Sequence, residues 1–175
     1  LKAGGMTEVG VVVNSLDSPL VKRIGNGDWL GVNVEYIVQE EQKGLAHAVS
    51  VCKDFVDGGA FAMFLGDNIF QDKMATFLKD FEGSDYEAGI ALGEVPDPSR
   101  FGVAVVENEQ VTRLVEKPKD PPSNLAIAGV YMFRQSIFDA IGQIEPSARG
   151  ELEITDAIQV LISGKHPVQD RKSVV

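Results

Sequence analysis

The chain is predicted to fold as an α/β protein, and three observations predict it. Strand-like and helix-like segments alternate three times over the first eighty residues. The segment Ala60 to Leu65 is apolar at every position, as in a strand buried on both faces of a parallel sheet. Polar residues then follow the expected strands, at the edge where open α/β sheets bind their ligands. Together these features predict a mainly parallel sheet with right-handed crossovers.

The first half of the chain supplies three strand–helix units. We expect strands at residues 9–13, 33–38 and 60–65, and helices at residues 18–24, 45–56 and 73–81. The first helix has the clearest start, because Ser18 is a favoured N-terminal cap and Pro19 suits the first turn. The longest predicted helix has apolar residues at helical spacing along its whole length.

In the second half, strands become more frequent than helices. We expect strands at residues 88–95, 102–107, 111–116 and 127–133, helices at 136–141 and 155–162, and a last strand from residue 168. The second and third of these strands flank a short polar turn and are predicted to form a hairpin. Because there is no repeat or linker, we expect residues 1–175 to form one continuous domain.

Composition excludes several classes of protein. The chain has 16 basic and 26 acidic residues among 175, a net charge of −10, which argues against a nucleic-acid backbone as partner. No apolar run approaches the roughly 20 residues of a membrane span. The only cysteine, Cys52, lies in a helical pattern and is expected to be a small buried residue. Without a disulfide framework, the cytoplasm is the expected compartment.

Common catalytic and cofactor motifs are absent or misplaced. The glycines of residues 25–31 have the wrong spacing for a dinucleotide fingerprint and follow a helix instead of a strand. His47 and His166 have no cysteine or second histidine at zinc-ligand spacing, so a zinc site is not expected. His47 is predicted to be a partly exposed helix residue.

Asp67 is the first candidate site residue. It follows the apolar strand in the sequence Leu65-Gly66-Asp67-Asn68, so its carboxylate is expected at the carboxyl end of that strand. One hard carboxylate suits Mg²⁺, which takes one or two protein carboxylates together with substrate phosphates. Aspartate and asparagine also form turns and helix caps, so both interpretations remain open at this point.

Three further groups of polar residues have the chemistry of a nucleotide and sugar-phosphate site. Gln39 can both donate to and accept from the edge of a pyrimidine base, and Gly44 could let a flat ring approach the backbone. Glu116 and Lys117 could hold a sugar hydroxyl and a phosphate together. Arg149 could bind a phosphate with its planar guanidinium. Each group alone is also compatible with an ordinary polar loop or a solvated charge pair.

Taken in order, these segments resemble the sugar-phosphate nucleotidylyltransferases, in particular the glucose-1-phosphate thymidylyltransferase type. The resemblance covers nearly the whole chain. It is carried by Val38-Gln39 with Gly44 to Ala48, Leu65 to Asn68, Asp97-Pro98 with Phe101 to Val103, Glu116 to Pro118, and Pro146 to Asp156. The last of these motifs and the order of all five are the most specific features.

The resemblance implies a Rossmann-like three-layer sandwich with a mostly parallel central sheet. It implies transfer of a nucleotidyl group, from dTTP or UTP, to a sugar-1-phosphate such as glucose-1-phosphate, with Mg²⁺ as cofactor and pyrophosphate as the leaving product. On the nucleotide side, the resemblance implies that Gln39 and Gly44 recognise the base and that Asp67 binds Mg²⁺. On the sugar side, it implies that Gly102 and Glu116 contact the sugar hydroxyls and that Lys117 and Arg149 bind the sugar phosphate. It also implies that Tyr131 lines the sugar pocket. Asp67, Lys117 and Arg149 would take part in catalysis. The family is commonly oligomeric, so a homo-oligomer is an expectation.

Two departures from the family pattern matter. The family's glycine-rich loop with its arginine and lysine, which follows the first strand, is absent, and a second metal-binding aspartate would lie beyond Val175. The resemblance therefore implies that residues 1–175 are part of a nucleotidyltransferase catalytic domain. We expect a sheet without the family's first strand and C-terminal part, and an isolated chain with little or no turnover. Two alternatives remain: a glycosyltransferase of similar fold, although an Asp-x-Asp motif is missing at Asp67, and a non-catalytic relative that binds nucleotide sugars.

Overall fold

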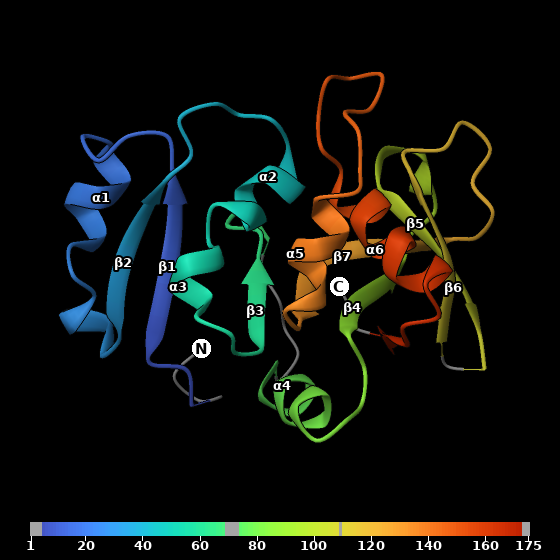
Figure 1. The fold of residues 1–175 in the computed structure, drawn as a ribbon, viewed down its shortest axis with the longest axis horizontal. Coiled ribbons are helices and arrows are strands. Elements are labelled where there is room, and N and C mark those ends of the chain that lie inside the picture. Colours follow the sequence, from blue (N-terminus) through green and yellow to red (C-terminus); the bar gives the residue numbers. More distant parts are fainter. Residues whose placement is uncertain (1–4, 69–73, 109, 173–175) are drawn as a thin grey trace.

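The computed structural model describes residues 5–68, 74–108 and 110–172. Its elements, in chain order, are β1 (Glu8–Val13), α1 (Pro19–Ile24), η2 (Asp28–Leu30), β2 (Asn33–Val38), α2 (Leu45–Ser50), α3 (Lys53–Val56), β3 (Phe61–Phe64), α4 (Met74–Glu82), β4 (Ala88–Glu94), η3 (Pro98–Arg100), β5 (Gly102–Glu107), β6 (Gln110–Glu116), β7 (Leu125–Phe133), α5 (Ser136–Ile141), α6 (Ile154–Ser163) and β8 (Val168–Lys172) (Figure 1). Within the described ranges, no helix has the length and apolar character needed to cross a membrane.

The strands form two sheets. β1 and β2 pair in parallel, with Glu8 opposite Asn33 and Val13 opposite Val38. The other strands form a six-stranded sheet in the order β3-β7-β4-β8-β6-β5, and β7 also pairs with β5. Among the described residues no strand pairing joins the two sheets, so β1 and β3 each have one edge without a strand partner. In Figure 1, β1, β2 and β3 all point toward the same side of the molecule.

The α/β class is confirmed, but the larger sheet contains more antiparallel pairs than the alternating pattern predicts. Parallel pairing is found for β1 with β2 and for β4 with β8. β7 lies between β3 and β4 and runs antiparallel to both, which means that β3 and β4 themselves share a direction. The physical reason is that β7 follows the β5–β6 hairpin through a loop. A parallel neighbour would need a long crossover such as a helix, whereas a strand that returns through a loop can pair antiparallel.

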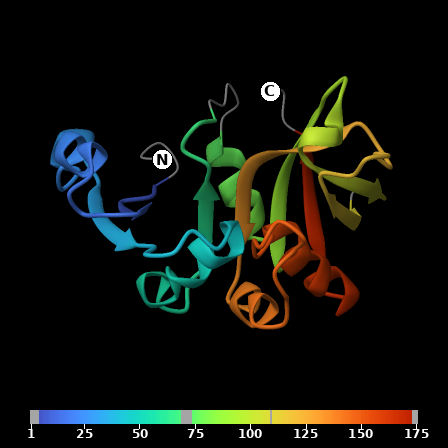
Figure 2. The ribbon, with the colours of Figure 1, turned by 90° about the horizontal axis from the view of Figure 1, so that it is seen from above.

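Helices cover both faces of the six-stranded sheet. On one face α2, α5 and α6 pack against the strands in a core that includes Ile90, Leu92, Ile137 and Ile158. On the other face α4 packs Phe77 and Phe81 against the opposite sides of β4 and β7. Figure 2 shows α5 and α6 on one side of the strands and α4 on the other. The expected three-layer arrangement is therefore present in this part of the molecule.

Most predicted boundaries agree with the structure to within one residue, and two differ by more. The helix expected at residues 45–56 is divided into α2 and α3, because the chain tightens into a turn where Cys52 donates its backbone N–H to the carbonyl of Val49 at 3.0 Å. The strand expected to begin at residue 127 begins at Leu125. The predicted start of the third helix at Lys73, and the end of the last strand beyond residue 172, lie outside the described residues.

Candidate functional site

Two loops, one following the small sheet and one following the large sheet, meet on the side of the molecule drawn uppermost in Figure 1. The first comprises residues 39–44 after β2, and the second comprises residues 142–153 between α5 and α6. Leu152 donates its N–H to the carbonyl of Lys43 at 2.7 Å, and its own carbonyl accepts the N–H of Ala46 at 3.0 Å. These bonds join the loop predicted to read a base to the loop that carries Arg149.

Gly44 makes this close approach possible. Its φ of 101° lies in the region that side chains rarely adopt. A Cβ added there would lie 2.6 Å from the carbonyl oxygen of Leu152 and 2.7 Å from its nitrogen. Because both of these atoms belong to backbone, neither could move aside cheaply. Gly44 is therefore required for the contact between the loops, whatever it does toward a ligand.

Gln39 lies half-buried at the end of β2, with its carboxamide turned toward the start of α2. Its Nε2 is 3.3 Å from the carbonyl oxygen of Gly44 and 2.9 Å from Nδ1 of His47. His47 is half-buried, so its prediction as a partly exposed helix residue holds, but its contact with Gln39 was not anticipated. The signal was present in the sequence, because a helix that begins just after Gly44 places His47 in its first turn, next to the strand end.

Gly102 and Glu116 form the next part of the site. They lie opposite each other at the end of the β5–β6 pair. Oε2 of Glu116 accepts a hydrogen bond from Oγ1 of Thr155, at the start of α6, at 3.1 Å. A Cβ at residue 102 would lie 2.8 Å from Cγ2 of Thr155 and 3.2 Å from that same carboxylate oxygen. Because Gly102 has no side chain, the Glu116 carboxylate and Thr155 of α6 can approach each other beside it.

Arg149 is held in place by carboxylates. Its Nε and Nη2 lie 3.1 and 2.9 Å from Oε1 of Glu153, a residue with only 5% exposure, and the same oxygen accepts from Ser147 at 2.7 Å. Nη2 is also 3.0 Å from Glu151 and 3.7 Å from Glu116. Within the described ranges Nη1 has no hydrogen-bond partner. The guanidinium is therefore fixed on one side and available to an anion on the other.

Lys117 completes this cluster. Its Nζ lies 3.8 Å from Oε1 of Glu116, and its backbone N–H donates to the carbonyl of Phe101 at 3.0 Å. Its φ of 40° is uncommon for a residue with a side chain and is strained. The structure therefore brings together Gly102, Glu116, Lys117 and Arg149, four of the predicted site residues, and links them through residue 152 to Gly44.

The electrostatic environment of Glu116 is unusual for a surface carboxylate. Burial raises its pKa, and the charge of Glu153 adds to the effect, whereas the hydrogen bond from Thr155 and the charges of Lys117 and Arg149 oppose it. A carboxylate in such a low-dielectric position makes stronger hydrogen bonds with a ligand hydroxyl than one in water. The position suits the predicted contact with a sugar hydroxyl.

Tyr131 lies in the core of the larger sheet. It is 4% exposed near the C-terminal end of β7, and its ring stacks on Phe133 with 5.8 Å between the ring centroids. Burial raises the pKa of its hydroxyl, and the charge of Glu116 raises it further. Tyr131 therefore packs in the core of the larger sheet, and its contribution to a sugar pocket stays a prediction.

Asp67 is exposed after the end of β3. Its neighbour Asn68 fixes the turn, donating from Nδ2 to the carbonyl of Ala128 at 2.8 Å and from its backbone N–H to the carbonyl of Leu65 at 3.2 Å. The Asp67 carboxylate has no hydrogen-bond or ion-pair partner among the residues that the structure describes. In the same residues, no group of three or more His, Cys, Asp and Glu side chains could hold a metal. A free hard carboxylate fits Mg²⁺ as a single protein ligand, with the other positions left for phosphates and water.

Two residues of the cluster, Glu153 and Thr155, were not predicted as site residues. Both lie within the sequence motif that carries Arg149, but a glutamate before a helix is usually exposed, and only the fold shows that this one is buried. Among the described residues, no hydrogen bond or ion pair links Asp67 or Tyr131 to the cluster.

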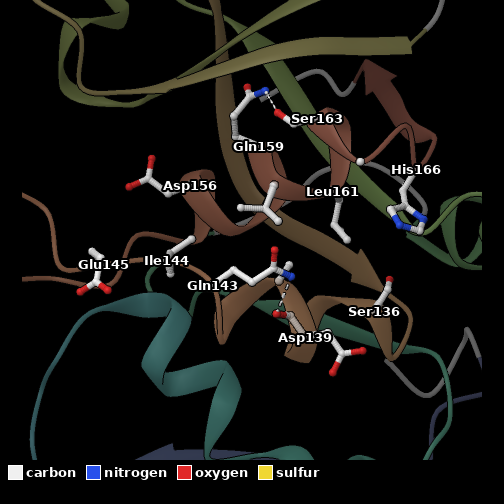
Figure 3. Close-up of a pocket in the computed structure, with 13 residues that line it drawn as sticks. Ser136, Asp139, Gln143, Ile144, Glu145, Asp156, Gln159, Leu161, Ser163 and His166 are labelled. Atoms are coloured by element: carbon white, nitrogen blue, oxygen red, sulfur yellow. Dashed lines mark hydrogen bonds between the residues drawn. The ribbon is translucent and has the colours of Figure 1, made fainter.

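A groove of about 750 Å³ lies elsewhere, between α5 and α6 (Figure 3). Its walls carry the carboxylates of Asp139, Glu145 and Asp156 and the ring of His166, as Figure 3 shows. Burial raises the pKa of Asp156, and the charge of Glu153 adds to the effect. None of the predicted site residues lines this groove, although residues 143–145 of the loop that carries Arg149 do.

Known proteins resemble this chain along nearly its whole length. The family model described as nucleotidyl transferase matches residues 1–173. The chain is 47% identical over 170 residues to the low-salt glycan biosynthesis nucleotidyltransferase Agl11 of Haloferax volcanii. This match covers 96% of this chain and 48% of that protein. It is 41% identical over 170 residues to a glucose-1-phosphate thymidylyltransferase of Streptomyces griseus, covering 97% and 48% of the two chains.

A solved structure agrees with these relatives. A Bacillus anthracis protein assigned as a glucose-1-phosphate thymidylyltransferase, solved with sucrose, superposes with a TM-score of 0.88 at 34% identity, over 98% of this chain and 70% of that one. The chain spans about half the length of the curated relatives it matches. The match over nearly every residue, together with the shared fold, shows that this chain belongs to the nucleotidyl transferase family.

Proposed function

We propose that the protein containing this chain transfers a nucleotidyl group from dTTP or UTP to a sugar-1-phosphate, with glucose-1-phosphate as the first candidate, and releases pyrophosphate. The observation that carries the proposal is the direct junction of the two loops. The backbone of Lys43, beside the predicted base-reading residues, is hydrogen-bonded at 2.7 Å to Leu152, in the loop that holds Arg149. A nucleotide and a sugar phosphate bound to these loops would be neighbours.

On the nucleotide side, Gln39 and Gly44 would hold the base. The Gln39 carboxamide is already bonded through its nitrogen, at 2.9 Å from His47, and would meet the base with its oxygen. Uracil and thymine present the same ring N–H, so this contact fits both and leaves the choice between dTTP and UTP to other groups.

On the sugar side, Glu116 and the backbone at Gly102 would bind hydroxyls, and Lys117 and Arg149 would bind the phosphate. Two like unit charges about 5 Å apart repel by about 3 kcal/mol at an effective dielectric of 20, so a monophosphate meeting a triphosphate needs this compensation. The cations would align the phosphate oxygen with the α-phosphorus, which is attacked in line as pyrophosphate leaves. Positioning and charge neutralisation supply most of the catalysis in such reactions.

Asp67 would hold Mg²⁺, which when bound would neutralise charge on the triphosphate. Replacing Asp67 with Asn in the complete protein should lower Mg²⁺-dependent turnover by about a hundredfold or more, because the amide loses the ligand charge. The melting temperature should stay the same, because the side chain has no described partner to lose. Asp54→Asn, on the exposed surface of α3, is the matched control and should retain full activity.

The test is pyrophosphate release by the complete protein with glucose-1-phosphate and each pyrimidine triphosphate. Turnover that requires both substrates supports the proposal, and no pyrophosphate from any pairing of dTTP or UTP with a sugar-1-phosphate would refute it. The isolated 175-residue chain should release little or none, because its described cations serve the sugar phosphate and leave the triphosphate uncompensated. Near-normal turnover by that chain would contradict this part of the proposal.

A further inference from the structure

The contact between Gln39 and His47 fixes which end of the carboxamide faces a ligand. The Gln39 nitrogen lies 3.3 Å from the carbonyl oxygen of Gly44, and a backbone carbonyl can only accept a hydrogen bond. The atom facing that carbonyl must therefore be the amide nitrogen and not the amide oxygen. The same nitrogen lies 2.9 Å from Nδ1 of His47, so its second hydrogen is directed to the ring.

This arrangement also determines the tautomer of His47. A ring nitrogen that receives a hydrogen bond carries no hydrogen itself, so Nδ1 is the bare nitrogen and Nε2 carries the proton. Both hydrogens of the Gln39 amide are then used inside the protein. The oxygen, Oε1, has no hydrogen-bond partner among the residues that the structure describes.

We propose that His47 is a positioning residue that presents the oxygen of Gln39 to the base and so selects pyrimidines with a ring N–H at position 3 over cytosine. This inference rests on the proposed function and deepens it. Uracil and thymine carry a hydrogen at that ring nitrogen and can donate it to Oε1. Cytosine has a lone pair there, which would face the lone pairs of the same oxygen.

His47 is well placed for this role, because the helix that carries it is firmly anchored. Ala46 and Val49, on either side of it in α2, are 0% and 2% exposed. Turning the Gln39 amide over would place its oxygen against the carbonyl oxygen of Gly44, which is a repulsive contact, and would require His47 to move its ring proton from Nε2 to Nδ1. In the observed orientation, His47 accepts the shorter of the two hydrogen bonds that hold the amide nitrogen in place.

The test measures kcat/KM of the complete protein with UTP, dTTP and CTP for two single variants of His47, a single variant of Gln39 and one double variant. His47→Leu removes the acceptor at similar size and should lower the preference for UTP and dTTP over CTP by about tenfold, mainly through KM, as expected for loss of one oriented hydrogen bond. His47→Asn keeps an acceptor near the position of Nδ1 and should stay within about twofold of the wild type. If His47→Leu does not fold, as judged by its melting temperature, His47→Ala replaces it.

The Gln39→Leu variant and the double variant test whether His47 acts through Gln39. Once Gln39→Leu has removed the carboxamide, adding His47→Leu should change the preference no further, because coupled residues are not additive. A folded His47→Leu or His47→Ala variant with unchanged preference, or additive effects in the double variant, would overturn the inference. These outcomes are distinct from failure of the proposed function, in which the wild-type protein would show no turnover with any pyrimidine triphosphate.

Discussion

The two-stranded sheet and the six-stranded sheet both contribute to the candidate site, but they are buried to different depths. Within β1 and β2, which are fully described, only Val13 is buried, and α1 beside them has no buried residue. In β4, six of seven residues are buried, and in β7 seven of nine. The half of the site predicted to read the base therefore follows a lightly packed unit, whereas the phosphate-binding half is built on the main core.

This difference gives the contact between the loops its importance. The base-reading loop is connected to the core side of the site by two backbone hydrogen bonds of Leu152, at the point where Gly44 allows close approach. Regions with few buried apolar contacts open most easily. We therefore expect the nucleotide half to be the more mobile half of the site and to gain most order when a ligand binds.

The largest expected effect contrasts two phenylalanines. Phe133→Ala, at a residue with 0% exposure in β7, should lower the free energy of unfolding by about 3–5 kcal/mol. Phe55→Ala, in α3, should cost clearly less, because Phe55 is half-buried and packs its ring near Gly10 of the small sheet. Urea unfolding of the two variants measures the contrast. Equal losses would mean that the two units are equally well packed.

Gly44 and Gly58 form the second contrast. Both have a positive φ, 101° and 82°, but a Cβ at Gly58 would meet no atom within 4 Å. Gly58→Ala should therefore cost only backbone strain, about 1 kcal/mol, whereas Gly44→Ala should cost about 2–4 kcal/mol because it also collides with backbone. Gly44→Ala should also raise KM for the nucleotide, and Gly58→Ala should not. If the two variants behave alike in unfolding and in KM, the contact between the loops has no special role.

The smallest expected effect concerns Glu116. Burial raises the pKa of Glu116 in the folded state above its pKa in the unfolded state. The protonated side chain therefore favours folding at a pH below the unfolded-state pKa, and this stabilisation is lost as the pH rises through the folded-state pKa. At neutral pH the charge is thus a cost, and Glu116→Gln should leave the melting temperature unchanged or raise it, by less than about 4 °C. The difference from the wild type should shrink near pH 4, and KM for the sugar phosphate should rise. A clear fall in the melting temperature of Glu116→Gln at pH 7 would mean that the Glu116 charge stabilises the fold, and would contradict this prediction.

Much of this fold could be predicted from the sequence because local patterns encode it. The apolar run at residues 60–65 and the hairpin before Lys117 formed as expected. The position of β7 could not be predicted, because a strand reached through a loop carries no local signal of its neighbours. The predicted residues Glu116, Lys117 and Arg149 do lie together, but the buried carboxylate of Glu153 depends on packing between distant segments.

The two halves of the site can be tested most directly by hydrogen exchange of the complete protein with each ligand alone. We predict that dTTP or UTP with Mg²⁺ slows exchange mainly in residues 38–46, and that glucose-1-phosphate slows it mainly in residues 116–118 and 147–153. The nucleotide should produce the larger change, because its loop starts from the less buried sheet. Protection confined to the groove between α5 and α6, with no change in either loop, would contradict the account.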